Sequence, residues 1–110
     1  MEPRKRTILH YVDENGVNVF REWLYGLKDD RGRAAILKRL DRVALGLLGD
    51  HRYVGHGVWE LRIDFGPGYR LYFAEEGVTT VVLFSGGDKS SQASDIRQAH
   101  RRCAEYWRRS

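Results

Sequence analysis

The sequence predicts an α+β fold of two layers, in which one strand and two helices precede a three-stranded antiparallel meander and a final helix. The period of the apolar residues carries this prediction: it is helical over residues 20–48, two over 58–74, and helical again over 96–107. Turn-forming residues at 66–68 and 75–77 separate the later strands. Strands joined by such short turns are antiparallel neighbours.

The first strand is expected over residues 7–12, which are rich in β-branched and aromatic side chains. The turn cluster at 13–16 ends it. A short helix follows, because four apolar residues recur at helical spacing. These are Phe20, Trp23, Leu24 and Leu27.

A second, longer helix is expected to be capped by Asp29 or Asp30 and to end at Gly49. Its apolar side consists of Ile36, Leu37, Leu40, Val43, Ala44, Leu47 and Leu48. Residues 50–57 have no clear period, so a loop is expected there.

Three strands are then expected, over residues 58–65, 69–74 and 78–84. The third is apolar at both parities, which is typical of a central strand. Residues 86–89 are expected to form a loop, and Ser90 or Ser91 to cap the last helix. The apolar positions of that helix are Ile96, Ala99, Cys103, Tyr106 and Trp107.

Composition is typical of one domain spanning residues 1–110, with a formal net charge of +4. The basic residues are 15 arginines and 4 lysines, which suits a polyanionic partner, although a codon bias toward arginine would give the same ratio. A single cysteine, Cys103, excludes an intrachain disulfide and a cysteine-cluster zinc site. No apolar run is long enough to span a membrane, and the basic residues 1–6 lack the apolar stretch of a signal peptide. A cytoplasmic protein is expected.

Alternation on the first two meander strands places a polar cluster on the sheet face opposite the helices, which is expected to be open to solvent. Its members are Glu60, Arg62, Asp64, Arg70 and Tyr72. This cluster is the best candidate site. The alternative interpretation is a solvated face with cross-strand ion pairs such as Glu60–Arg70.

Other polar groups carry weaker signals. Lys89 lies between a strand and a helix, where backbone amides can hold a phosphate, although the segment lacks the spacing of a nucleotide-binding loop. His51 and His56 have no metal-ligand partners at suitable spacing, and His56 is a candidate acid or base. The arginines at 97, 101, 102, 108 and 109 form either a solvated face or a surface for phosphates or an acidic partner.

Several segments resemble the RelE/ParE toxin superfamily, in particular its HigB-like branch, the phage-derived addiction module killer proteins. They are Glu-Leu-Arg at 60–62, Gly-Pro-Gly-Tyr-Arg-Leu-Tyr-Phe at 66–73, Gly-Gly-Asp-Lys-Ser-Ser-Gln at 86–92 and Asp-Ile at 95–96 with Ala99, together with the apolar pattern of the first helix. The resemblance implies a RelE-like two-layer fold and the toxin of a type II toxin–antitoxin system. Such a toxin is a metal-independent endoribonuclease, without cofactor, that cleaves mRNA on the ribosome and is neutralised by a cognate helix-turn-helix antitoxin.

The resemblance also implies roles for individual residues. Arg70 and Lys89 match basic residues of the family, and strand parity adds Arg62 on the same face; these three would hold the scissile phosphate, with Ser90 as a further phosphate contact. Tyr72, Asp88, Glu60 and His56 would be candidates for proton transfer. RelE-like enzymes place two lysines and a tyrosine where this sequence has Leu61, Ile63 and Asp95, so the proton-transfer residues differ. The alternatives are a ParE-like inhibitor of DNA gyrase and an inactive relative that only binds an antitoxin.

Overall fold

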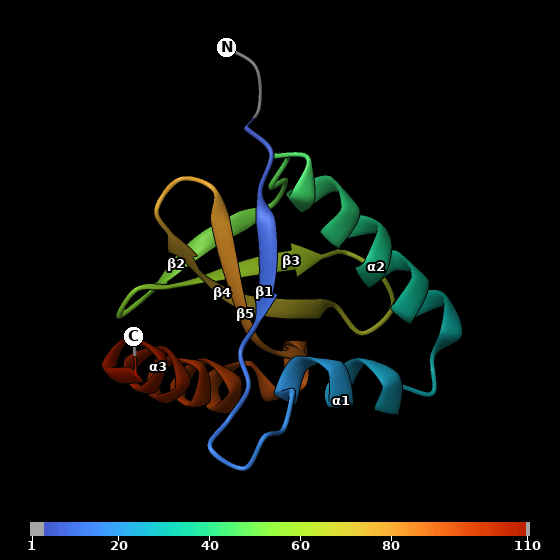
Figure 1. The fold of residues 1–110 in the computed structure, drawn as a ribbon. Coiled ribbons are helices and arrows are strands. Elements are labelled where there is room, and N and C mark those ends of the chain that lie inside the picture. The colour runs from blue at the N-terminus through green and yellow to red at the C-terminus, as the bar shows by residue number, and fades with distance from the viewer. Residues whose placement is uncertain (1–3, 110) are drawn as a thin grey trace.

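The fold consists of three α-helices and five β-strands within residues 4–109, the part of the chain that the computed structural model describes (Figure 1). The first three residues of the basic N-terminal stretch lie outside this part. In chain order the elements are β1 (Thr7–His10), α1 (Val19–Gly26), α2 (Asp30–Ala44), β2 (His51–Gly55), β3 (Val58–Ile63), β4 (Tyr69–Glu76), β5 (Thr80–Asp88), the single 3-10 turn η1 (Lys89–Ser91) and α3 (Gln92–Arg109). The α+β class is confirmed. No helix among these residues has the length and apolar composition needed to cross a bilayer.

The strands form one mixed sheet in the order β1-β5-β4-β3-β2. The antiparallel meander β3-β4-β5 is confirmed, and β1 pairs in parallel with the other side of β5. β5 therefore lies inside the sheet with a strand on each side, as its apolar sequence predicts. The remaining strand, β2, pairs antiparallel with β3 and forms the edge of the sheet opposite β1.

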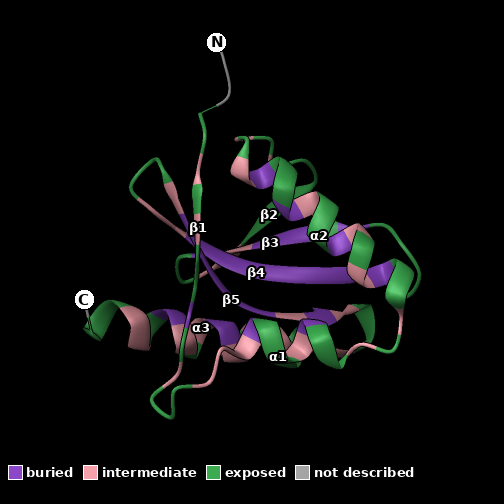
Figure 2. Ribbon diagram, turned by 45° about the vertical axis from the view of Figure 1, so that its right-hand side comes forward, coloured by how far each residue is buried: buried purple, intermediate pink, exposed green. Residues whose placement is uncertain are grey.

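Two apolar clusters lie on opposite faces of this sheet. Alternate residues of β5 contribute to each: Val81 and Leu83 pack with α1 and α2, whereas Val82 and Phe84 pack with α3. The side chains on both faces of β4 are buried from Tyr69 to Ala74, so the middle of the sheet is shielded from solvent on both sides (Figure 2). The expectation of an open polar face is wrong, because the apolar stripe of α3 covers much of it.

The first half of the chain differs from expectation in three places, the first of which is that β1 ends at His10 rather than at Val12. α2 ends at Ala44 rather than at Gly49, because Gly46 adopts φ +88° and the amides of residues 46 and 47 bond back to Val43 and Arg42. These are the two bonds of a Schellman motif. The expected loop contains β2, an edge strand whose first three residues are exposed, so no alternation of polarity marks it.

The end of β5 also differs. Gly86 and Gly87 continue the strand instead of forming a loop. A Cβ on Gly86 would lie 2.3 Å from the Trp23 ring, and one on Gly87 would lie 1.9 Å from Asp95 Oδ2, so only glycine fits under these side chains. Asp88 caps the 3-10 turn η1, which leads into α3.

Candidate functional site

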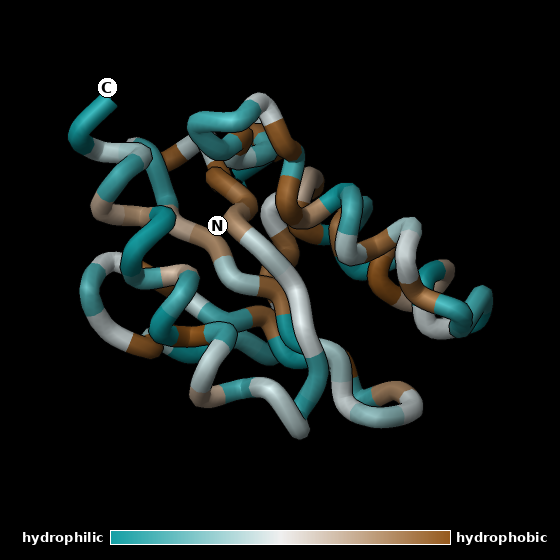
Figure 3. The backbone as a smooth tube through the Cα atoms, turned by 90° about the horizontal axis from the view of Figure 1, so that it is seen from below, coloured by the Kyte–Doolittle hydropathy of each residue, from teal (hydrophilic) through white to brown (hydrophobic). Residues whose placement is uncertain are grey.

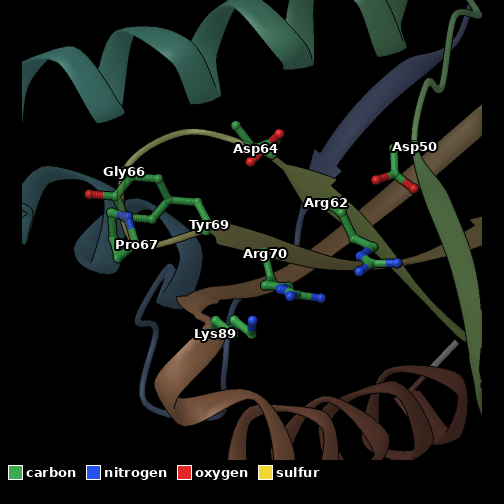
Figure 4. A pocket seen from close by; sticks show the side chains of 10 residues that line it. Asp50, Arg62, Asp64, Gly66, Pro67, Tyr69, Arg70 and Lys89 are labelled. Atoms are coloured by element: carbon green, nitrogen blue, oxygen red, sulfur yellow. The ribbon is translucent and has the colours of Figure 1, made fainter.

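A pocket of about 440 Å³ lies beside the β3–β4 turn. Its lining brings together three of the cationic residues that the sequence predicts as a phosphate site, Arg62, Arg70 and Lys89. Two carboxylates, Asp50 and Asp64, line the same pocket. Figure 4 shows the two arginines pointing the same way from neighbouring strands, with Lys89 beside them at the start of the turn into α3.

The two arginines are direct cross-strand partners, since Arg62 pairs with Arg70 in the β3–β4 register. Side chains at paired positions of an antiparallel sheet lie on the same face, and like charges placed opposite one another are destabilising. Arg62 is exposed and makes no side-chain hydrogen bond or ion pair with any residue between 4 and 109. Arg62 is therefore a cation without a partner among the described residues, next to a second arginine, and an anion bound there would pair with it.

Lys89 reaches the pocket because the preceding residue, Asp88, pairs with Tyr69 at the start of β4. A Cβ on Gly68 would lie 3.6 Å from the Lys89 Cβ, which places Lys89 alongside the turn at 66–68. That turn closes with a hydrogen bond from Gly68 N to the carbonyl of Phe65. Lys89 is exposed, and within the described chain its ammonium has no hydrogen-bond or ion-pair partner.

Glu60 is fully buried and holds Arg70 in place. Its Oε1 accepts hydrogen bonds from Arg70 Nη1 and Arg52 Nε, both at 3.1 Å, and its Oε2 accepts one from Gln92 Nε2 at 3.0 Å. Burial raises the pKa of Glu60, but the hydrogen bonds from Gln92 and Arg52 and the charges of the two arginines outweigh it, and the pKa is lowered. Glu60 is thus an ionised anchor outside the pocket rather than a free acid or base.

Tyr72 does not reach the pocket. It is completely buried on the α3 side of the sheet, packed in the same cluster as Phe84 and Ala99. Burial, and after it the charges of Glu60 and Asp95, raise the pKa of its phenol. The hydroxyl makes no hydrogen bond of normal geometry to the described residues.

Asp88 and Ser90 stabilise the turn that carries Lys89. The Asp88 carboxylate accepts hydrogen bonds from the Ser90 backbone amide at 2.8 Å and from the Ser90 hydroxyl at 2.5 Å. The Ser90 hydroxyl, above all, lowers the pKa of Asp88. Neither residue lines the pocket; together they set the direction of the chain on either side of Lys89.

His56 lies at the opposite end of β3. It occupies the β2–β3 turn with φ +51°, and its ring contacts that of His100 at a centroid separation of 4.6 Å. Val58, the first residue of β3, and Arg62 are four strand steps of about 3.3 Å apart, so the turn that carries His56 lies more than about 13 Å from Arg62 along the strand. Between residues 4 and 109, no three histidine, cysteine or carboxylate side chains are grouped so as to hold a metal ion.

Arg39 was missed by sequence reasoning, although it organises the pocket from α2. Its guanidinium donates to the carbonyls of Leu48 at 3.0 and 2.8 Å, Asp50 at 2.7 Å and Arg62 at 2.8 Å. The Arg62 amide in turn donates to the Asp50 carbonyl. All three acceptors are backbone groups, which leave no signal in the sequence.

Comparison with known proteins finds a relative to which no activity is assigned. No family model matches the chain. An uncharacterized protein of Haemophilus influenzae is 46% identical over 80 residues, which are 73% of this chain and 81% of the length of that protein.

Proposed function

The chain belongs to the same family as the Haemophilus influenzae protein, and we propose that it is a toxin of a type II toxin–antitoxin system, of the RelE/ParE superfamily. In this proposal it is a metal-independent endoribonuclease that cleaves mRNA on the ribosome in the cytoplasm. A cognate helix-turn-helix antitoxin neutralises it.

One observation carries the proposal: Arg62 and Arg70 face each other across β3 and β4 and share a pocket with Lys89. One guanidinium group can bind two phosphate oxygens through two parallel N–H···O hydrogen bonds. Cations also stabilise the additional negative charge of a phosphorane-like transition state. Arg70 is held rigidly by Glu60, whereas Arg62 and Lys89 retain all their donors for a ligand. This arrangement suits a single phosphate better than an extended protein surface.

RNA supplies its own nucleophile in such a reaction. The 2′-hydroxyl loses its proton and attacks the adjacent phosphorus, and the bond from phosphorus to the 5′-oxygen breaks. The products are a 2′,3′-cyclic phosphate and a 5′-hydroxyl. Asp50 and Asp64 are the carboxylates that line the pocket, and we assign one of them as the acceptor of the 2′-hydroxyl proton. The Lys89 ammonium supplies a proton to the leaving oxygen.

The placement of Tyr72 and His56 favours the two alternatives that do not cleave RNA. With these two groups away from the pocket, the same cations would hold an anion without cleaving it. A ParE-like gyrase inhibitor or an antitoxin-binding relative would fit that arrangement, and the experiment below distinguishes them.

The experiment is induced expression in a bacterial host, followed by primer extension on total RNA. Arg62→Ala and Lys89→Ala are the informative variants, because both side chains are exposed and unpaired within the described chain. Arg70→Ala is unsuitable, since it removes a partner of the buried Glu60. Arg42→Ala, an exposed arginine on α2, is the matched control.

We expect cuts inside translated reading frames for the wild type and the control, and their loss in the two pocket variants. Cuts that persist in both variants would refute the phosphate site. Intact messages with altered DNA supercoiling would support gyrase inhibition, and intact messages with normal growth would support a binding protein.

A further inference from the structure

Three arginines lie in line on the outer face of α3, at positions 97, 101 and 108. At about 100° per residue they fall within an arc of roughly 40°, with axial spacings of about 6 and 10 Å. Ala99 and Cys103, the buried residues of α3, lie on the opposite side of the helix. The three arginines therefore point away from the sheet, and Figure 3 shows that α3 is hydrophilic along most of its length.

These three side chains make no hydrogen bond or ion pair with any other residue from 4 to 109, and all three are exposed. Arg109 on the same helix behaves differently: it pairs with Glu105 at 3.3 Å, donates to the Val12 carbonyl at 2.7 Å and lies over the Tyr11 ring. Like charges four residues apart destabilise a helix. Because no hydrogen bond or ion pair within residues 4–109 engages the three guanidinium groups, all of their donors are available to a ligand.

We infer that the outer face of α3 is a second RNA-binding surface, which contacts phosphates flanking the nucleotide held in the pocket. This inference rests on the proposed function. Lys89 precedes α3 by three residues, and Arg97 lies about 8 Å along the helix from its first residue. RNA leaving the pocket over the start of α3 therefore meets Arg97 first, then Arg101 and Arg108.

The chemistry of this face favours RNA over a membrane surface. An interfacial helix inserts large apolar residues into the lipid beside its cations. Beside the arginines this face carries the small, exposed Ala93 and Ala104, and Trp107, which is 43% exposed, lies about a quarter-turn round the helix. The other apolar residues, Ile96, Ala99, Cys103 and Tyr106, are packed against the sheet. A single exposed tryptophan offers little apolar area for insertion into lipid, whereas a line of arginine forks matches a phosphate backbone.

The test measures binding rather than cleavage. A fluorescein-labelled, single-stranded oligoribonucleotide with 2′-O-methyl groups cannot supply the attacking hydroxyl but keeps every phosphate. Its affinity is measured by fluorescence anisotropy between 50 and 300 mM salt, for the wild type and for the triple variant Arg97→Ala, Arg101→Ala, Arg108→Ala. The matched control, Arg21→Ala, Lys38→Ala, Arg42→Ala, removes the same charge from exposed positions of α1 and α2.

Each lost phosphate contact lowers the slope of log K against log salt by about 0.7 for a single strand. We expect the α3 variant to lose about two units of slope and at least about tenfold in affinity at 50 mM salt, and the control to keep most of the wild-type slope. Equal losses in both variants, or a wild-type slope in the α3 variant, would overturn the inference. If the α3 inference is overturned but Arg62→Ala still weakens binding, the proposed function stands and only the α3 surface is refuted. If the wild type does not bind the oligonucleotide, the proposed function and the α3 surface are both refuted.

Discussion

Replacing Glu60 by glutamine tests the buried ion pair that positions Arg70. Glu60 is 0% exposed, and the Arg70 side chain is 9% exposed. Glu60→Gln keeps the shape and an oxygen for the Gln92 hydrogen bond but removes the charge. Arg70 is then left as a buried cation without a counterion, a defect that costs about 3–5 kcal/mol.

This loss is large for a domain of 110 residues, whose total stability is about 5–15 kcal/mol. At about 4 °C per kcal/mol for this length, the melting temperature is expected to fall by roughly 12–20 °C. Circular dichroism at 222 nm during a thermal scan measures the shift.

Arg52→Ala is the matched control, because it removes the partner of Glu60 that is 52% exposed and easily solvated. It is expected to cost less than about 1 kcal/mol, or less than about 4 °C. The double variant Glu60→Gln with Arg70→Gln should cost less than the two single variants added together. If Glu60→Gln lowers the melting temperature no more than Arg52→Ala does, the buried pair does not support the site and the reasoning fails.

Three further outcomes follow from single contacts. Arg39→Ala removes a donor from three backbone carbonyls, of which only that of Asp50 keeps a described partner, the Arg62 amide. It is expected to lower the unfolding free energy by about 2–4 kcal/mol in urea titrations, with Arg39→Lys recovering only part of it. Gly86→Ala is expected to cost about 1–3 kcal/mol, because the new methyl group would meet the Trp23 ring; the loss should shrink when Trp23 is replaced by leucine. The Tyr69 hydroxyl lowers the pKa of Asp29 in the folded chain, so the carboxylate contributes stability that is present above about pH 4 and is lost as the pH falls through the folded pKa. The urea midpoint should therefore drop between pH 6 and pH 3, and Asp29→Asn should flatten that drop.

The meander could be predicted from the sequence because each of its strands has one apolar parity facing α1 and α2. Residues at the other parity, such as Tyr72, were assigned to solvent, and nothing local indicates that α3 folds back over them. β2 was missed because an edge strand with exposed side chains shows no alternation. The end of β5 was missed because Gly86 and Gly87 are typical of a loop, although here they make room for Trp23 and Asp95.

The candidate site was predictable in part for the same reason. Parity places Arg62 and Arg70 on one face, and the short turn brings the neighbouring strands into register, so both could be paired without a structure. The position of Lys89 beside the two arginines could also be predicted, because it needs only that β5 end next to β4. Arg39 and Asp50 were out of reach, since their role depends on the packing of α2 against the end of β3 and on backbone acceptors. The roles of all these residues in catalysis stay predictions.

The parallel pairing of β1 with β5 constrains the order in which the chain can fold. Thr7 pairs with Thr80, so β1 finds its neighbour only after more than 70 further residues have been synthesised. The meander and its cationic pocket form from contacts close in sequence, whereas closing the long loop to β1 carries a larger entropy cost. During synthesis, β1 therefore stays unpaired, and the apolar faces of α1 and α2 stay partly exposed, until β5 completes the sheet. A nascent chain that has not reached residue 83 cannot complete this pairing, and we expect it to be open to chaperones and proteases until β5 emerges.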